Sequence, residues 1–404
     1  MAGIPTSSPD PQRILALGRN EKDAATAAIR SMPLEEQVAL VCETPLARRS
    51  EMLVLLPIPE DVIPLIPEAE LCFTVKAIGI EDSSWLLEHA TPEQVVACMD
   101  LDSWQGTLPN RDAIDRWLDV LSIGSEASYL RSIRGLDPEL VVLFLKHRIQ
   151  CHQKPDDDED WQPPEGGQTV DGQFYFVAVR DRDDLAAIIV MLRSLFTVDY
   201  WMYFRMMQGV IHEPDSENEE WALRWRTGRL EDLGFPPWDR ALRIYRFIRP
   251  EDRILIPEET GALDVGEWHL PVWMPSLPAS LDHQHLLFRT LARLSEEERR
   301  SALYGFISLA NKVAVADRME LGDAESTPRA IDKAAAFASD GLEFIAAKTN
   351  LDATDVIRRV NIERLFRVGA NLNPERARPR ESAQIDLSES EKTILSTLPR
   401  QHGH

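Results

Sequence analysis

The feature that most restricts the fold is a series of prolines between residues 31 and 150, each followed by apolar residues at helical spacing. After Pro33 the apolar positions fall on one helical face. They are Leu34, Val38, Val41 and Cys42. Proline suits the first turn of a helix because its missing N–H would have no helical partner there. We therefore predict that Pro33 begins a short helix.

Prolines at expected helix starts recur along this part of the chain. Further helix starts are expected at Pro45, Pro59, Pro67, Pro92 and Pro138. Thr91 and Asp137 directly precede two of these prolines, and such side chains cap helices. Helices of about 8 to 14 residues are marginal alone in water, so their apolar faces must pack on one another. The sequence thus predicts an α-solenoid or a compact array of short helices over residues 31–150.

Three of these starts carry a resemblance to known repeats. They are "PEDV" at 59–62, "TPEQV" at 91–95 and "DPELV" at 137–141. They resemble the short-helix superhelical repeats in the cytoplasmic N-terminal domain of MgtE-type magnesium transporters and in the flagellar motor-switch protein FliG. The resemblance implies a superhelical fold used for protein contacts or regulation. It transfers no metal ligands, and since the transporter's membrane helices are lacking, we do not expect transport.

The regions around this array have a different composition. Residues 1–30 are expected to form an N-terminal extension. Residues 151–172 are acidic and rich in Pro and Gly, which predicts a linker. The stretch "QFYFVAV" at 173–179 favours a strand because aromatic and β-branched residues dominate it. An apolar helix is expected at 198–211, followed by a solvated acidic break at 212–220.

The strongest helical patterns lie between residues 279 and 370. Two apolar stripes of equal spacing run from Ala302 to Ala316 and from Ile331 to Ile345, and matched stripes suggest an antiparallel bundle. We therefore expect a mainly helical domain with a small β element at 173–370 and a flexible tail at 371–404. The predicted fold class is mainly α, with an N-terminal superhelical array joined to a larger helical domain.

Two further pieces resemble a bacterial family of undefined function. They are "RLEDLGFPPWDRALRIYRFI" at 229–248 and "NIERLFRVGANL" at 361–372. The shared features are a turn before a helix with a late tyrosine, and "LFRVG" near the C-terminus. This resemblance would cover most of the chain, and it implies no activity.

Charge and cysteine usage narrow the classes of function. The formal net charge is −23, which argues against binding to nucleic acid because phosphate backbones would be repelled. No targeting segment is visible, and the longest apolar stretch, at 185–192, is too short to cross a bilayer. The four cysteines form no CxxC pair, which favours reduced core thiols. We expect a cytoplasmic protein without membrane insertion.

No metal site or cofactor is predicted. The acidic run at 156–160 lacks the glycine and the final glutamate of an EF-hand, whose positions hold Trp161 and Gly167. His269, His283 and His285 lie close in sequence. If 283–285 is helical, the last two side chains point about 200° apart, so they cannot share an ion.

The most conspicuous cluster of polar and aromatic residues is basic and lies between residues 221 and 249. We single out seven candidate ligand-binding residues, namely Trp221, Arg224, Trp225, Arg229, Arg240, Arg243 and Arg246. Arginines recur every three residues from 240 to 249, which on one helix would form a drifting face. Guanidinium groups beside aromatic rings hold phosphates, carboxylates or flat rings. The alternative is that these arginines pair with the chain's own carboxylates.

These observations favour a non-enzymatic protein-interaction or regulatory module with an unidentified protein partner. No catalytic residue can be named, because no GxSxG, P-loop, GxGxxG or HExxH motif occurs. The first alternative is a small anionic-ligand binder or an enzyme that uses the cluster at 221–249. A weaker alternative, suggested by the transporter resemblance alone, is a divalent-cation sensor.

Overall fold

The computed structural model describes residues 10–157, 160–179, 185–255, 285–322 and 326–377. The chain forms two compact units, the first ending at Arg229 and the second beginning at Leu230. The described residues are mainly helical with small β elements, so the predicted fold class is confirmed.

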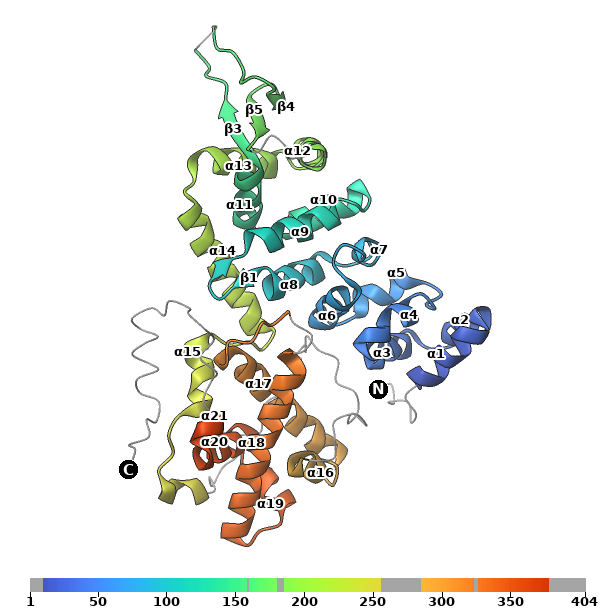
Figure 1. Ribbon diagram of the computed structural model, residues 1–404, viewed down its shortest axis with the longest axis vertical. Coiled ribbons are helices and arrows are strands. Elements are labelled where there is room, and N and C mark those ends of the chain that lie inside the picture. The colour runs from blue at the N-terminus through green and yellow to red at the C-terminus, as the bar shows by residue number, and fades with distance from the viewer. Residues whose placement is uncertain (1–9, 158–159, 180–184, 256–284, 323–325, 378–404) are drawn as a thin grey trace. The chain divides into compact units, whose positions relative to one another are not determined.

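The first unit is built from short helices joined by tight turns (Figure 1). Its α-helices up to the sheet are α1 Pro11–Asn20, α2 Lys22–Arg30, α3 Leu34–Glu43, α4 Arg49–Leu53, α5 Pro59–Val62, α6 Glu68–Ile78, α7 Ser84–Leu87, α8 Pro92–Asp102, α9 Arg111–Leu121, α10 Glu126–Gly135 and α11 Pro138–Arg148. Two 3-10 turns, η1 Leu46–Arg48 and η2 Ile63–Leu65, and a small hairpin of β1 Trp104–Gln105 and β2 Leu108–Pro109 complete this part.

The prolines mark helix starts in two ways. Pro59, Pro92 and Pro138 occupy the first turn of their helices, as predicted. Pro33 and Pro67 instead take the cap position one residue earlier, in an extended conformation. Both positions tolerate the missing N–H, because neither would donate a hydrogen bond within the helix.

Each helix in the middle of the first unit packs on the helix two places further along the chain. One row runs α6, α8, α10 and α12, and the other runs α7, α9, α11 and α13. The helix α12 spans Ala186–Val198 and α13 spans Tyr200–His212. On α9 the buried face is Ile114, Trp117, Leu118 and Leu121. The short helices therefore bury their faces against one another, as their length requires.

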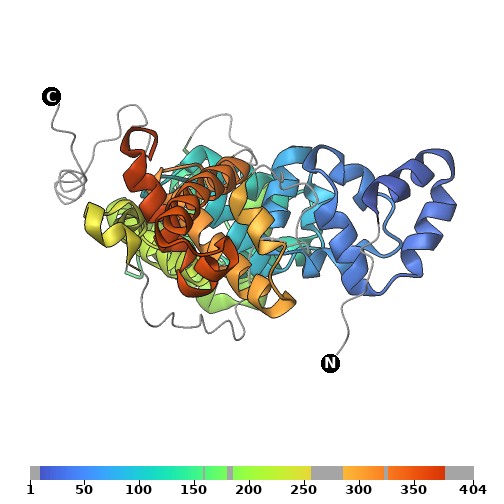
Figure 2. The same ribbon diagram turned by 90° about the horizontal axis from the view of Figure 1, so that it is seen from below.

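The N-terminal residues continue the array. The helices α1 and α2 pack on each other, and α1 also contacts α3 and α4. Figure 2 shows these blue helices side by side at one end of the first unit. Residues 11–30 are thus part of the first unit's packing.

The expected linker at 151–172 lies inside the first unit and contributes to a sheet. The strands β3 Ile149–Gln153, β4 Gln168–Thr169 and β5 Phe174–Ala178 form an antiparallel sheet in the order β3-β5-β4. The strand predicted from "QFYFVAV" is confirmed as β5, with Phe174 and Phe176 fully buried.

Two predictions for the end of the first unit have different outcomes. The apolar helix at 198–211 is confirmed as α13, although Trp201 is 77% exposed. The acidic break at 212–220 is wrong, because α14 spans Asp215–Asp232. Acidic side chains such as Asp215 and Glu217 favour a helix N-terminus through the helix dipole, so the acidic run begins a helix.

The second unit combines two long helices with several short ones (Figure 1). Its elements are α15 Trp238–Ala241, η3 Leu242–Tyr245, η4 Pro250–Ile254, α16 Leu286–Leu291, α17 Glu296–Ala316, α18 Ser326–Thr349, α19 Ala353–Arg359, α20 Ile362–Leu372 and α21 Pro374–Ala377. The apolar stripes of α17, α18 and α20 form its core. Residues 371–377, the first of the predicted flexible tail, are largely helical because they belong to the end of α20 and to α21.

The crossing of α18 and α20 depends on two glycines. A Cβ atom on Gly341 would lie 1.9 Å from the backbone oxygen of Leu365, and one on Gly369 would lie 1.9 Å from the backbone oxygen of Phe337. Only glycine allows the two backbones to approach this closely. Gly369 is the glycine of "LFRVG", so this piece of sequence has a packing role.

Among the described residues, no helix is both long enough and apolar enough to cross a bilayer. His269 and His283 lie outside the described residues, so the structure does not show whether they lie near His285.

Candidate functional site

Two arginines of the predicted cluster serve internal contacts. Arg229 donates hydrogen bonds at 2.7 and 2.9 Å to Asp100 on α8, and two more, both at 2.7 Å, to Asp137 before α11. Arg226 donates to the backbone oxygen of Asp100 at 2.7 Å and lies over the ring of Trp104 at 4.8 Å. Arg229 therefore pairs with the chain's own carboxylates, as the alternative predicted, whereas Arg226 is held by a backbone oxygen and a ring. These contacts tie α14 to α8 and to the start of α11.

Burial and hydrogen bonding together set the pKa values of Asp100 and Arg229. Asp100 is 1% exposed, and burial raises the pKa of its carboxyl although the hydrogen bonds from Arg229 act in the opposite direction. Burial also acts to lower the pKa of Arg229, but hydrogen bonds to Asp100 and Asp137 outweigh it and raise that pKa. A guanidinium engaged by two carboxylates has no free donor edge for a ligand.

Three other predicted residues lie together on the exposed side of α14. The rings of Trp221 and Trp225 stack at 6.1 Å with an interplanar angle of 26°. The guanidinium of Arg224 lies 5.2 Å from the centre of the Trp221 ring. The two tryptophans are 41% and 50% exposed, so this group faces solvent.

The remaining three predicted residues belong to the second unit and do not share one α-helix. The chain is α-helical only over α15, continues as the 3-10 turn η3, and leaves helical geometry at Arg246. Arg240 lies 3.6 Å from Glu231. Arg243 and Arg246 are exposed, and neither forms an ion pair with another described residue. The prediction of one long arginine face on a helix is wrong. Arg224 on α14 is likewise exposed and forms no ion pair with another described residue, and the anionic-ligand alternative stays a prediction.

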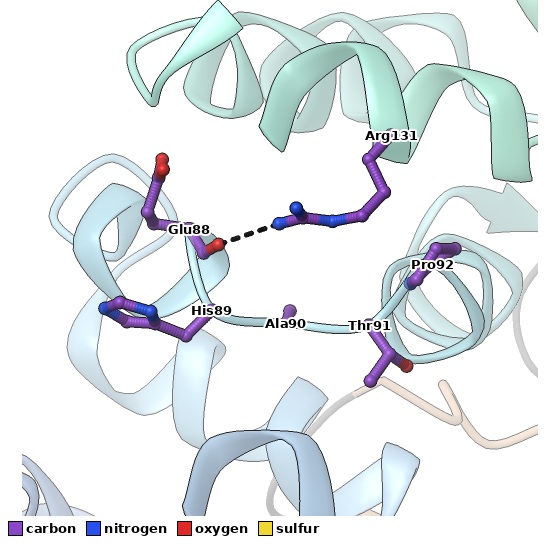
Figure 3. A pocket seen from close by; sticks show the side chains of 6 residues that line it. All are labelled: Glu88, His89, Ala90, Thr91, Pro92 and Arg131. Atoms are coloured by element: carbon purple, nitrogen blue, oxygen red, sulfur yellow. Dashed lines mark hydrogen bonds between the residues drawn. The ribbon is translucent and has the colours of Figure 1, made fainter. Parts of the chain in front are cut away.

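The first unit also contains a hollowed surface that the sequence did not indicate. Two open hollows of about 470 and 500 Å³ share Pro92 and Arg131. The first, shown in Figure 3, is lined by Glu88, His89, Ala90, Thr91, Pro92 and Arg131. The second is lined by Pro92, Ala127, Leu130, Arg131, Arg134, Gly135 and Asp199. We refer to the two hollows together as the Pro92 groove.

One wall of the groove is the turn between α7 and α8. Thr91 and Gln94 form a reciprocal capping box at the start of α8. The carboxylate of Glu88 accepts hydrogen bonds from the backbone N–H and the hydroxyl of Ser125, the N-cap of α10. These hydrogen bonds lower the pKa of Glu88. The turn and the start of α10 are thus locked together.

The other wall of the groove is α10. A Cβ atom on Gly135 would lie 2.7 Å from the Cβ of Pro92, so glycine permits the close approach of α10 to the start of α8. Arg134 pairs with Asp199 at 3.2 Å. Arg131 donates to the backbone oxygen of Glu88 and to the hydroxyl of Ser128, both at 3.1 Å. Both acceptors of Arg131 are neutral, and its side chain is exposed in the groove.

Part of the Pro92 groove is predictable from the sequence. The capping box in "TPEQV" fixes where α8 begins, and the glycine of "RGLDPE" is a place where another backbone can come close. Which helices meet there depends on the tertiary packing of α8 and α10, so the groove itself could not be predicted.

The described part of the chain contains no group of three or more His, Cys, Asp or Glu side chains placed to hold a metal ion. A family model described as "Family of unknown function (DUF6178)" matches residues 26–378.

The chain belongs to this family. The DUF6178 match begins within α2 and extends past α21, so it includes both units and the Pro92 groove. The predicted membership of a family of undefined function over most of the chain is confirmed. No curated protein and no solved structure matches the chain.

Proposed function

We propose that this protein is a non-enzymatic protein-interaction module, and that the Pro92 groove receives an extended segment of a partner protein. The observation that carries the proposal is the pair of hollows on either side of Pro92, cut into a stack of helices that have buried their faces on one another. The superhelical arrangement implied by the repeat resemblance belongs to this proposal, and so does a cytoplasmic location.

The size and lining of the groove suit a chain segment. Each hollow has a volume in the range of ligand pockets, and the two are adjacent, so an extended segment would cross Pro92 from one to the other. Ala90, Pro92, Ala127 and Leu130 offer an apolar floor for small side chains. A regulatory partner would thus be recognised by shape along several residues.

The charge of Arg131 indicates one feature of the partner segment. Its hydrogen bonds go to neutral oxygens, whereas a carboxylate would add the attraction of opposite charges and can accept two parallel N–H bonds from one guanidinium. We therefore expect the bound segment to place an Asp or Glu side chain, or a C-terminal carboxylate, next to Arg131.

The test is affinity capture from native lysate with the full-length chain and two groove variants. Ala127→Trp would fill the second hollow from an exposed position, and Arg131→Ala would remove the guanidinium. We expect at least one protein to be captured by the wild type and lost with both variants. Arg116→Ala, at an exposed position on α9, is the matched control and should keep the same partner.

Circular dichroism and thermal unfolding would show that all three variants keep the fold. If the wild type captures no specific protein, or if every captured protein is retained by both groove variants, the proposal is wrong.

A further inference from the structure

The solvent side of α14 carries a continuous exposed face in the first unit. It consists of Glu217, Glu220, Trp221, Arg224, Trp225 and Gly228, all of them exposed. These positions recur at intervals of three and four residues, so they lie along one side of the helix. We call this face the α14 ridge.

Two large aromatic side chains on such a face are costly to leave in water. Trp221 and Trp225 are 41% and 50% exposed, and they stack on each other instead of entering the core. Tryptophan is enriched where proteins meet, because its large apolar area becomes useful when a partner covers it. The ridge therefore has the composition of a contact surface.

The charges on the ridge are arranged so that the ridge complements itself. Acids lie at its N-terminal end as Glu217 and Glu220, and the basic residue Arg224 lies beyond Trp221. The C-terminal end is a glycine, and a Cβ atom on Gly228 would meet nothing within 4 Å. If a second ridge approaches in the opposite direction, its Glu220 comes near Arg224 and its Glu217 faces the open space at Gly228.

We propose that the protein forms a two-fold homodimer in which two α14 ridges pack antiparallel. With the axis between Trp221 and Arg224, each Arg224 lies opposite Trp221 of the other copy and can reach the other copy's Glu220. Gly228 lies opposite Glu217 of the other copy, where the absence of a side chain leaves room. The Arg224–Trp221 contact within one copy shows that this guanidinium and this ring suit each other.

The dimer is expected to be weak. A single helix face buries less than the roughly 800 Å² per partner of a standard interface. Each chain also carries a formal net charge of −23, so two copies repel each other at long range. The local pairing of Arg224 with Glu220 offsets this repulsion only at the ridge.

The experiment is sedimentation velocity on the full-length chain at about 1 to 100 μM, the range that covers weak association. The wild type is expected to shift from monomer to dimer across this range. Trp221→Ala combined with Trp225→Ala should remove the dimer, since the apolar area of the ridge is lost.

A charge exchange tests the antiparallel register. Arg224→Glu alone places like charges opposite each other and should weaken dimerisation about a hundredfold, and Glu220→Arg alone should do the same. The two changes together restore opposite charges and should recover the wild-type dimer within about a few-fold. Arg193→Glu, at an exposed position on α12, makes the same change in net charge and should leave dimerisation unaltered.

A wild type that remains monomeric at the highest concentration would overturn this inference, as would a dimer that survives Arg224→Glu. Failure of the double exchange to recover the dimer would equally overturn it. The inference does not depend on the Pro92 groove, so neither result bears on the proposed function.

Discussion

In the first unit, α1 to α13 have at most 13 residues each, whereas the second unit contains α17 with 21 residues and α18 with 24. Every helix end leaves backbone groups without intrahelical partners, so many short helices produce many such groups in a small volume. Both units must satisfy them, because the second unit also contains the short helices α15, α16, α19 and α21. The two units differ in how far long helices contribute to the packing.

The first unit meets this need with buried polar side chains. Arg49 is 4% exposed and donates to the backbone oxygens of Cys42 and Thr44 at the end of α3. Gln94 is 2% exposed and donates to the backbone oxygens of Ile63 and Ile66 around η2. The ends of short helices are thus joined to their neighbours by single side chains.

The second unit has ties of this kind too, for example from Asn371 to the backbone of Arg246 and Ile248, and adds the close approach of two helices. At the crossing of α18 and α20, Gly341 and Gly369 bring the two backbones into contact. The comparison teaches that polar side chains tie helix ends together in both units, and that the second unit adds a backbone contact between two helices that only glycine permits.

The largest effect is expected from a methyl group at that crossing. Gly369→Ala would place a Cβ atom 1.9 Å from the backbone oxygen of Phe337, and neither backbone can move without separating the helices. We expect the second unit to lose about 4 kcal/mol or more. Hydrogen exchange measured on peptides of α18 and α20 would show the loss there and little change in the first unit.

Gly228→Ala is the control for this prediction. Nothing lies within 4 Å of the added Cβ atom, so alanine should stabilise α14 by about 0.5 to 1 kcal/mol. Equal effects of the two alanines would show that the glycine crossing is not what holds the second unit.

The next effect concerns Arg49. In Arg49→Met the backbone oxygens of Cys42 and Thr44 lose the guanidinium, and the ion pair to Glu70 at 2.8 Å is broken. Breaking a buried pair by removing one partner should cost about 3 kcal/mol. Urea unfolding followed by tryptophan fluorescence would measure the cost, with the exposed Arg116→Met as control. A loss no greater than that of the control would contradict this account of the first unit.

A smaller effect is expected at Gln94. In Gln94→Ala the two backbone oxygens lose their donor and the capping box with Thr91 is broken, which should cost about 2 kcal/mol. Thermal unfolding would report the change, and Glu93→Ala at the neighbouring exposed position should have the smaller effect. If Gln94→Ala and Glu93→Ala lowered the stability equally, the hydrogen bonds of Gln94 would not be what joins α8 to η2.

The smallest effect depends on pH and lies in the second unit. The pKa of Glu298 is lowered to about 2 by hydrogen bonds from Arg358 and from Ser295, the N-cap of α17. A carboxyl whose pKa is lower when folded stabilises the protein above its unfolded pKa of about 4.3, and this stabilisation is lost as the pH falls toward 2. Glu298→Gln should therefore lower Tm at pH 6, and the difference from wild type should shrink between pH 4 and 2. The neighbouring exposed Glu297→Gln should show no such convergence.

Much of the secondary structure could be predicted from local sequence. The prolines at 33, 59, 67, 92 and 138 lie at helix starts, and the stripes from Ala302 to Ala316 and from Ile331 to Ile345 lie on α17 and α18. The acidic run at 212–220 begins a helix, against the prediction of a solvated break, because acids also favour a helix N-terminus. The arginine series from 240 to 249 does not lie on one long helix, because Pro237 and Pro250 confine the helical segment to the few residues between them.

Less of the candidate site than of the secondary structure could be predicted from local sequence. Trp221, Arg224 and Trp225 do lie together, because their spacing alone places them on one face of α14. The sequence could not show that Arg229 is engaged by Asp100 and Asp137, which lie about 90 to 130 residues earlier in the chain. Nor could it indicate the Pro92 groove.

By itself, the sequence determined that this chain folds into short helices followed by a region with two long ones, since proline position and apolar spacing act within a few residues. Only the tertiary structure decided which arginines are internal, where Gly341 meets Gly369, and that a hollow lies beside Pro92. The physical reason is the separation along the chain of the residues that interact. Helix formation depends on neighbours along the chain, whereas ion pairs, backbone crossings and grooves depend on residues that only folding brings together.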